Sequence, residues 1–300
     1  MRALVMVVLC LGSCGRVDFG LQGGGQDAET RDGAADALAD AQADRSLDAE
    51  VPSGFGPVTM LPGLLLGTRN DDDDPSLTGD LLEIYFNRGS ALYVSERDSV
   101  ASEWNPPQQL TAFMGRSLTD PVVSRNGLFL VFASITDDAT ERDLRITSRA
   151  RRGEPWGPDR RIDEVALPDD DVPYWISDDG LEVWFGKERP QVLQSSRPMI
   201  GAAWSEAQTI LTPDPDRTLV SVSRSTPDGN LVISLNTSGQ DLLFEMEAHA
   251  DGGYGTPTPV AIAGIAPDED VSDGWLSPDG RSLWFTRGGV PQRNIVFAQR

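Results

Sequence analysis

Clusters of aspartate are the residues of this 300-residue sequence that could most readily do chemistry. They recur at intervals of about fifty residues. The candidate ligand-binding or partner-binding residues are Asp72, Asp74, Asp120, Asp170, Asp171, Asp214, Asp216, Asp268 and Asp270. Their carboxylates could hold a basic peptide side chain or a hard cation, and among metals they suit Ca²⁺ rather than zinc, although no EF-hand spacing is present. The alternative is that these aspartates provide only solubility and turn chemistry, often beside proline.

Other groups that commonly carry catalysis are scarce. The single histidine, His249, lies in the loop-like stretch EAHADGGYG, where a solvated surface position is the favoured interpretation. The sequence has no G-x-S-x-G motif, and its two cysteines, Cys10 and Cys14, both lie near the N-terminus. We therefore predict no catalytic residue, and a binding protein rather than an enzyme.

A repeat of about fifty residues organises the chain from residue 54 onward. In each unit an aromatic residue is followed six positions later by an aliphatic one, in the stretches WNPPQQL, WGPDRRI, WSEAQTI and YGTPTPV. A second marker, Ser/Thr-x-x-Gly, ends in Asn-Gly or Asp-Gly, which is typical of a tight turn between antiparallel strands. Arginine lies seven residues before three of the aromatics, at Arg97, Arg149 and Arg197, and a structural role is the favoured interpretation there.

These markers divide each unit into four short strands, and helical periodicity is nearly absent. Repeated units of four antiparallel strands are typical of a β-propeller. The last unit stops at Arg300 after its third strand, whereas GFGPVTML repeats the aromatic-plus-six spacing at Phe55 and Leu61. We therefore predict an all-β, five-bladed propeller of four-stranded blades, whose ring is closed by residues 54–62 completing the last blade.

The aspartate clusters all fall on the link from one blade's outer strand to the next blade's inner strand. Such links share one face of a propeller, so the clusters should form an acidic ring at the mouth of the central channel. Trp175 and Trp275, on predicted inner strands, are further candidates for ligand contact, because an exposed indole face can stack on a ligand. Core packing is the favoured interpretation of both tryptophans.

The stretches WLSPDGRSLWFTR and WISDDGLEVWFGK resemble the TolB-type, WD-like propeller repeat. The resemblance covers residues 55–300 and implies a scaffold whose members mostly bind other molecules. The N-terminus is similar to a bacterial lipoprotein signal, because the apolar run ends in Leu11-Gly12-Ser13-Cys14. This predicts a signal peptide over residues 1–13, lipidation at Cys14, and a Gly/Ala/Asp-rich tether over residues 14–53.

The net charge of −22 argues against nucleic acid and anionic lipid surfaces as partners. The predicted function is that of a monomeric, lipid-anchored, non-catalytic envelope propeller that binds a protein or peptide through its acidic ring. An outer-membrane, extracytoplasmic location is expected. The alternative is a carbohydrate-binding or carbohydrate-cleaving propeller, because some five-bladed propellers are glycosidases with paired carboxylates in the channel.

Overall fold

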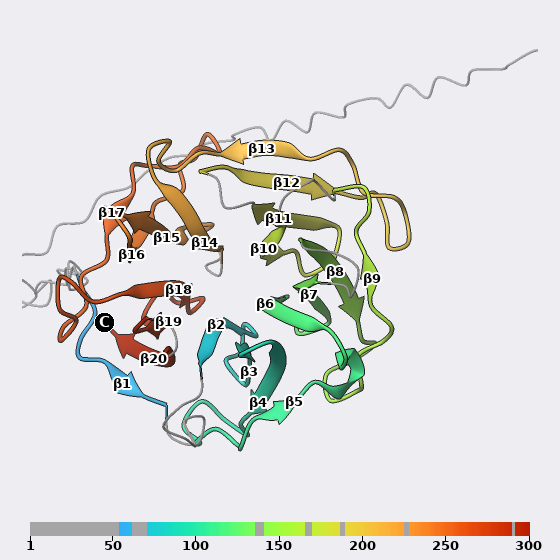
Figure 1. The fold of residues 1–300 in the computed structure, drawn as a ribbon, viewed down its shortest axis with the longest axis horizontal. Helices are drawn as coiled ribbons and strands as arrows, with labels where there is room; N and C mark the ends of the chain where they lie inside the picture. Colours follow the sequence, from blue (N-terminus) through green and yellow to red (C-terminus); the bar gives the residue numbers. More distant parts are fainter. Residues whose placement is uncertain are drawn as a thin grey trace, which may run out of the picture. The chain divides into compact units, whose positions relative to one another are not determined.

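The computed structural model describes residues 54–61, 71–135, 141–165, 170–186, 190–224, 228–289 and 292–300. Within them the chain is all-β, apart from one short 3-10 turn, η1 (Thr111–Phe113). Five antiparallel sheets of four strands stand around a central axis, as Figure 1 shows. The predicted five-bladed propeller is therefore confirmed.

Each blade runs from an inner strand beside the axis to a short outer strand. Blade 1 contains β2 (Asp72–Leu77), β3 (Glu83–Arg88), β4 (Ala91–Glu96) and β5 (Gln108–Gln109). Blade 2 contains β6 (Ser117–Val123), β7 (Phe129–Ile135), β8 (Arg142–Ser148) and β9 (Arg160–Arg161). Blade 3 contains β10 (Val172–Ile176), β11 (Glu182–Gly186), β12 (Val192–Ser196) and β13 (Gln208–Leu211). Blade 4 contains β14 (Thr218–Ser223), β15 (Leu231–Thr237), β16 (Gln240–Met246) and β17 (Thr258–Pro259). Blade 5 contains β18 (Val271–Leu276), β19 (Ser282–Arg287), β20 (Asn294–Gln299) and β1 (Thr59–Met60).

The Ser-x-x-Gly marker forms the turn between the first and second strands of a blade. In blade 3 the Ser177 hydroxyl oxygen accepts hydrogen bonds from the backbone N–H groups of Leu181 and Glu182. Gly180 has φ +67°, and its N–H donates to the Ser177 carbonyl at 2.9 Å. A glycine is required there because a side chain strains this left-handed conformation.

Phenylalanine fills the middle of four blades. The side chains of Phe86, Phe132, Phe185 and Phe285 are completely buried on the second strands. Ser234 replaces phenylalanine in blade 4, where its hydroxyl pairs with that of Ser221 at 2.8 Å. The middle of blade 4 therefore contains a polar contact in place of an aromatic ring.

The arginine that recurs in the sequence stacks on a tryptophan ring in three of the blades. The guanidinium groups of Arg97, Arg149 and Arg197 lie 4.3, 4.5 and 4.5 Å from the ring centres of the tryptophans that follow them by seven residues. Each arginine Nε also donates to a backbone carbonyl of the nearby turn, as Arg149 does to Gly127 at 2.7 Å. The guanidinium group thus ties the third strand of a blade to both its outer segment and its turn.

The ring closes with the same contact, made by the two ends of the domain. β1 pairs antiparallel with β20, opposing Thr59 to Phe297. The Arg300 guanidinium lies 4.6 Å from the ring centre of Phe55. The backbone N–H of Phe55 also donates to Ala261 in the preceding blade at 2.7 Å. The predicted closure by the N-terminal strand is confirmed, with regular pairing limited to Thr59–Met60 and residue 62 outside the described residues.

The predicted signal peptide, Cys14 and the tether also lie outside the described residues. In the part of the chain that the structure describes, no helix is long and apolar enough to cross a membrane.

Candidate functional site

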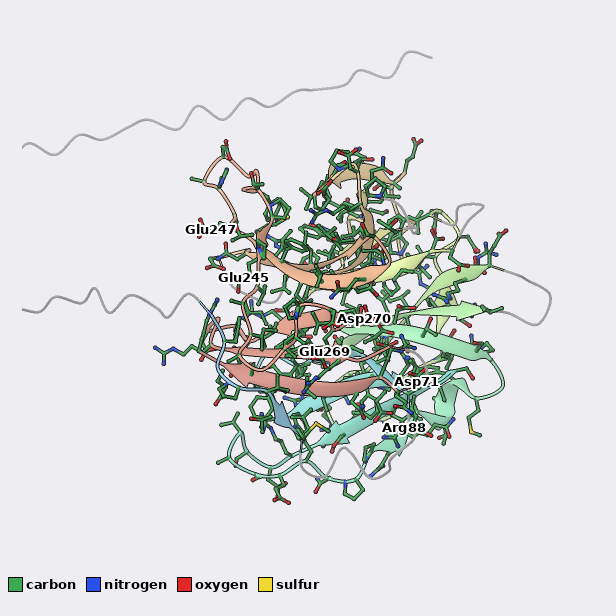
Figure 2. All side chains as sticks on the ribbon, turned by 60° about the vertical axis from the view of Figure 1, so that its left-hand side comes forward. Asp71, Arg88, Glu245, Glu247, Glu269 and Asp270 are labelled. Carbon is green, nitrogen blue, oxygen red and sulfur yellow. The ribbon has the colours of Figure 1, made fainter. Side chains whose placement is uncertain are left out.

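The candidate site is a cavity of about 610 Å³ at one mouth of the central channel. Strand direction brings polar groups there, because the inner strands begin at this end and the second strands finish at it. Figure 2 labels Asp71 and Asp270 on links at this end of the blades, apart from Glu247 beyond the opposite end of β16. Asp74, Asp120 and Asp270 line the cavity, so three of the predicted residues are brought together.

A β-bulge in each of three blades turns one aspartate toward the axis. In blades 1, 2 and 5 two inner-strand residues oppose a single phenylalanine of the second strand. The first residue of each bulge is Asp74, Asp120 or Asp273, with φ of 53°, 54° and 53°. Aspartate tolerates this left-handed conformation better than most residues other than glycine. The three side chains therefore line one cavity from three different blades.

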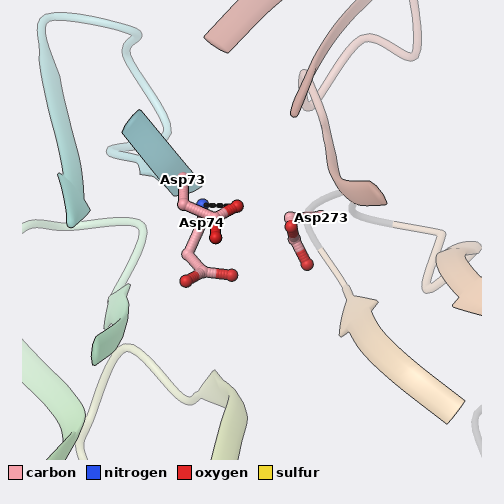
Figure 3. A group of neighbouring side chains, drawn as sticks. All are labelled: Asp73, Asp74 and Asp273. Atoms are coloured by element: carbon pink, nitrogen blue, oxygen red, sulfur yellow. Dashed lines mark hydrogen bonds between the residues drawn. The ribbon is translucent and has the colours of Figure 1, made fainter. Parts of the chain in front are cut away.

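Asp73, Asp74 and Asp273 form the tightest part of this site. One carboxylate oxygen from each lies within 4.8 Å of the others. Figure 3 shows Asp73 and Asp74 on one side and Asp273 facing them from another blade. The backbone N–H of Asp74 donates to the Asp73 carboxylate at 3.2 Å. The Ser272 hydroxyl donates to Asp273 at 2.6 Å.

Burial and mutual repulsion favour protons on this cluster. Burial raises the pKa of Asp74 well above its usual range, and the negative charges of Asp120 and Asp273 raise it further. Burial also raises the pKa values of Asp120 and Asp273. The pKa of Asp241, at the cavity wall, is raised by burial despite a hydrogen bond from Asn236. The channel therefore contains carboxyl groups that remain protonated to higher pH than an exposed aspartate.

Two arginines at the cavity wall compensate only part of this charge. Arg293 pairs with Asp71 at 2.9 Å and also with Asp73. Arg142 lies 3.7 Å from Asp120, which is too long for a hydrogen bond. One carboxylate oxygen of Asp120 is buried and has no hydrogen-bond partner among the described residues. Asp120 therefore shares a single loosely placed arginine, Arg142, with Asp170, and Asp74 forms no ion pair of its own among the described residues.

The other predicted aspartates lie outside the cavity. Asp72 is buried and paired with Arg88 at 2.6 Å, Asp170 lies 3.7 Å from Arg142, and Asp171 is fully buried. Asp214 pairs with Arg217 at 3.2 Å, whereas Asp216 and Asp268 are exposed. The prediction that all the clusters lie on links is wrong, because Asp72, Asp74 and Asp120 lie within the inner strands β2 and β6. Only part of the predicted acidic ring converges.

The two candidate tryptophans pack mainly against other aromatic rings. Trp275 is 6% exposed and lies 5.6 Å from Trp284 between ring centres, beside a narrow cavity of about 50 Å³ that Asp74 also lines. Trp175 lies 5.4 Å from Trp184 and under the guanidinium group of Arg224. These contacts favour the core-packing interpretation.

The sequence predictions did not include Asp273, Asp241 or Asn236 among the site residues. Asp273 lies within β18, just as Asp74 and Asp120 lie within β2 and β6, but it follows the predicted cluster at residues 268–270 by three positions and was not grouped with it. One signal could have identified it. Like Asp74 and Asp120, it lies four residues before the Ser/Thr that opens a turn.

Comparison with solved structures agrees with the propeller fold. The chain is similar to an endo-arabinase from Bacteroides thetaiotaomicron, with 12% identity, a TM-score of 0.55, and coverage of 80% of this chain and 96% of that chain. The catalytic domain of a Coprinopsis cinerea GH62 alpha-L-arabinofuranosidase is also 12% identical, with a TM-score of 0.53 and coverage of 83% and 98%. A TolB candidate from Agrobacterium tumefaciens is 13% identical, with a TM-score of 0.49 and coverage of 75% and 72%. No family model and no curated protein matches the sequence. At these identities the comparisons establish the fold alone.

Proposed function

We propose that the protein is a non-catalytic binding propeller that takes a basic side chain of a protein or peptide into its acidic channel mouth. The observation that carries this proposal is the convergence of Asp74, Asp120 and Asp273 from three blades, with incomplete compensation by arginine. Burial raises the pKa values of all three carboxyl groups, and repulsion from neighbouring carboxylates raises those of Asp74 and Asp120 further. A guanidinium or ammonium group would relieve that repulsion.

The electrostatic gain is large enough to select a cationic ligand. Two opposite unit charges 4 Å apart attract by about 4 kcal/mol at an effective dielectric constant of 20, before the cost of desolvation. The net charge of −22 also attracts cationic partners over a longer range, most strongly at low ionic strength.

Calorimetry with two short peptides tests this function. We expect Ac-Gly-Arg-Gly-NH₂ to bind at least about tenfold more tightly than its citrulline analogue, which has a similar shape but no charge. The Asp74→Asn/Asp120→Asn variant should lose about tenfold or more in affinity for the arginine peptide. Asp216→Asn/Asp268→Asn is the matched control, because it removes two exposed charges outside the cavity. Equal binding of the two peptides, or an equal loss in both variants, would reject the proposal.

A carbohydrate-binding or carbohydrate-cleaving propeller is the second candidate. It is favoured by carboxyl groups with raised pKa values in the channel, since a glycosidase needs a protonated acid beside an ionised carboxylate. The similarity in fold to an endo-arabinase and an arabinofuranosidase also supports testing this class. Arabino- and xylo-oligosaccharides are the probes. Hydrolysis that is abolished by Asp74→Asn would replace the first proposal, whereas binding without hydrolysis would identify a carbohydrate-binding module.

Binding of Ca²⁺ at this site is a separate proposal with its own test. We propose that Ca²⁺ binds the Asp73, Asp74 and Asp273 carboxylates, which offer the oxygen ligands that it prefers. Binding to the folded state alone should raise the melting temperature. A melting curve unchanged by about 5 mM Ca²⁺ or by EDTA would reject this site.

We further propose that Cys14 is lipidated and anchors a monomeric protein to the outer membrane, facing away from the cytoplasm. The support is the Leu-Gly-Ser-Cys sequence after an apolar run. Cys14→Ser should abolish labelling by radioactive palmitate and release the protein from the membrane fraction. Cys10→Ser is the control and should change neither.

A further inference from the structure

A separate cavity lies where blade 5 meets blade 1, at the seam closed by the N-terminal strand. Its volume is about 230 Å³, and it shares no described lining residue with the channel cavity. Leu61, Trp104, Trp284 and Phe297 provide an apolar and largely aromatic wall. Such a wall suits a flat apolar ligand of modest size.

The indole of Trp284 carries a buried donor without the partner that the equivalent indole has in blade 3. Trp184 at the equivalent position of blade 3 donates its indole N–H to Glu182 at 2.8 Å. In blade 5 the residue two positions earlier is Ser282, whose hydroxyl accepts from Gln299 at 3.1 Å. The side chain of serine is too short to replace glutamate there. Trp284 is 3% exposed, and its N–H has no hydrogen-bond partner among the described residues.

The cavity also contains a cation that no carboxylate neutralises among the described residues. The Arg97 guanidinium stacks on Trp104, and it donates to the carbonyls of Leu81 at 2.8 Å and Val100 at 3.1 Å. By contrast, the equivalent Arg149 pairs with Glu83 at 2.5 Å. Glu103 lines the same cavity but is exposed, so water screens its charge.

We propose that this seam cavity binds a small aromatic carboxylate. The aromatic ring of the ligand packs against Trp284 and Phe297, and its carboxylate accepts from the Trp284 N–H and from Arg97. Both halves of the ligand are needed. An apolar ligand without charge would leave the donor unpaired, and a bare anion would gain nothing from the aromatic wall.

Titration of the full chain with 3-phenylpropanoate, followed through the indole N–H signals of the seven tryptophans by ¹H–¹⁵N NMR, tests this proposal. For a ligand of this size we expect a dissociation constant of about 0.1–1 mM. The Trp284 signal, identified by its absence in Trp284→Phe, should move most. The neutral isostere 3-phenylpropanamide should bind at least about tenfold more weakly, because it lacks the charge.

Two variants and one matched control separate this site from any other. Trp284→Phe keeps the ring but removes the donor, and Ser282→Glu supplies an internal acceptor, so each should weaken binding by about tenfold or more. Trp184→Phe should leave the affinity unchanged, because its donor is already used within blade 3. Equal affinity for the acid and the amide, unchanged affinity in Ser282→Glu, or no saturation by about 20 mM would overturn the proposal.

Discussion

Replacing Phe55 with alanine tests whether the N-terminal strand holds the propeller ring closed. Phe55 is 4% exposed, packs with Phe285 and Val296 in the core of blade 5, and lies under the Arg300 guanidinium. Truncating a buried phenylalanine costs about 3–5 kcal/mol, and the lost cation–π contact adds about 0.5–1 kcal/mol. We therefore expect Phe55→Ala to lower the free energy of unfolding by about 4 kcal/mol.

Thermal unfolding followed by circular dichroism measures this loss. For a domain of 150–250 residues, 1 kcal/mol corresponds to about 2–4 °C, so the melting temperature should fall by roughly 8–16 °C. Met60→Ala is the control, because Met60 lies on the same N-terminal segment but is 52% exposed, and it should change stability by about 0.5 kcal/mol or less. If Phe55→Ala lowers the melting temperature no more than Met60→Ala, the closure does not stabilise the ring.

Deleting residues 54–62 removes the whole closing strand. The deletion should destabilise blade 5 and promote oligomers, because the edge of β20 would be open to pairing with another chain. Size-exclusion chromatography measures the oligomeric state, and thermal unfolding measures the loss of stability. A deletion variant that remained monomeric with unchanged melting would contradict the role of the strand.

Three further substitutions test the charges in and around the blades. Asp74→Asn should stabilise the protein by about 1 kcal/mol at pH 8. The raised folded-state pKa of Asp74 gives stability that is full below the unfolded-state pKa and is lost as pH rises. Urea unfolding should therefore show a smaller decrease in the free energy of unfolding between pH 5 and pH 8 in the variant than in the wild type. Burial opposes ionisation of Asp159, but hydrogen bonds from two arginines outweigh it and lower its pKa to about 2. Asp159→Asn should therefore lower the free energy of unfolding by about 1–2 kcal/mol at pH 7, and by less as pH falls from 4 toward 2. Arg149→Ala should lower the free energy of unfolding by about 3–5 kcal/mol, because it leaves the buried Glu83 carboxylate without this partner. Arg151→Ala is the control, since its side chain is 81% exposed, and in the same urea unfolding assay it should change stability by about 0.5 kcal/mol or less.

Much of the fold was predictable because the propeller repeat is local. The aromatic-plus-six spacing and the turn glycines depend on contacts within one blade, so they recur with the period of the sequence. The closure of the ring by the N-terminal strand was also predictable, since Phe55 and Leu61 repeat the spacing of an outer strand. The stacking of arginine on tryptophan was visible only as a spacing of seven residues, because the contact forms across a turn of the chain.

The candidate site was predicted in part. Asp74 and Asp120 belong to the predicted clusters and do line the channel, although they lie within inner strands and not on links. Asp214 and Asp216 form the same kind of cluster and lie outside the cavity. Composition does not distinguish them, because the direction of each side chain depends on the local backbone. Asp273 shows the converse, since a bulge inside a strand turns an otherwise ordinary strand residue toward the axis.

By itself the amino-acid sequence determined the number of blades, their four-strand plan and the strand that closes the ring, because these follow from periodic patterns of short range. Only the tertiary structure decided which carboxylates meet and which donors lose their partners. Asp74 and Asp273 come from opposite ends of the domain and become neighbours only when blade 5 closes against blade 1. The unpartnered N–H of Trp284 likewise depends on the residues packed around it. Convergence of this kind is set by ring geometry, which no single repeat contains, and by bulges, whose position the spacing to the turn residue marks without showing which carboxylates will meet.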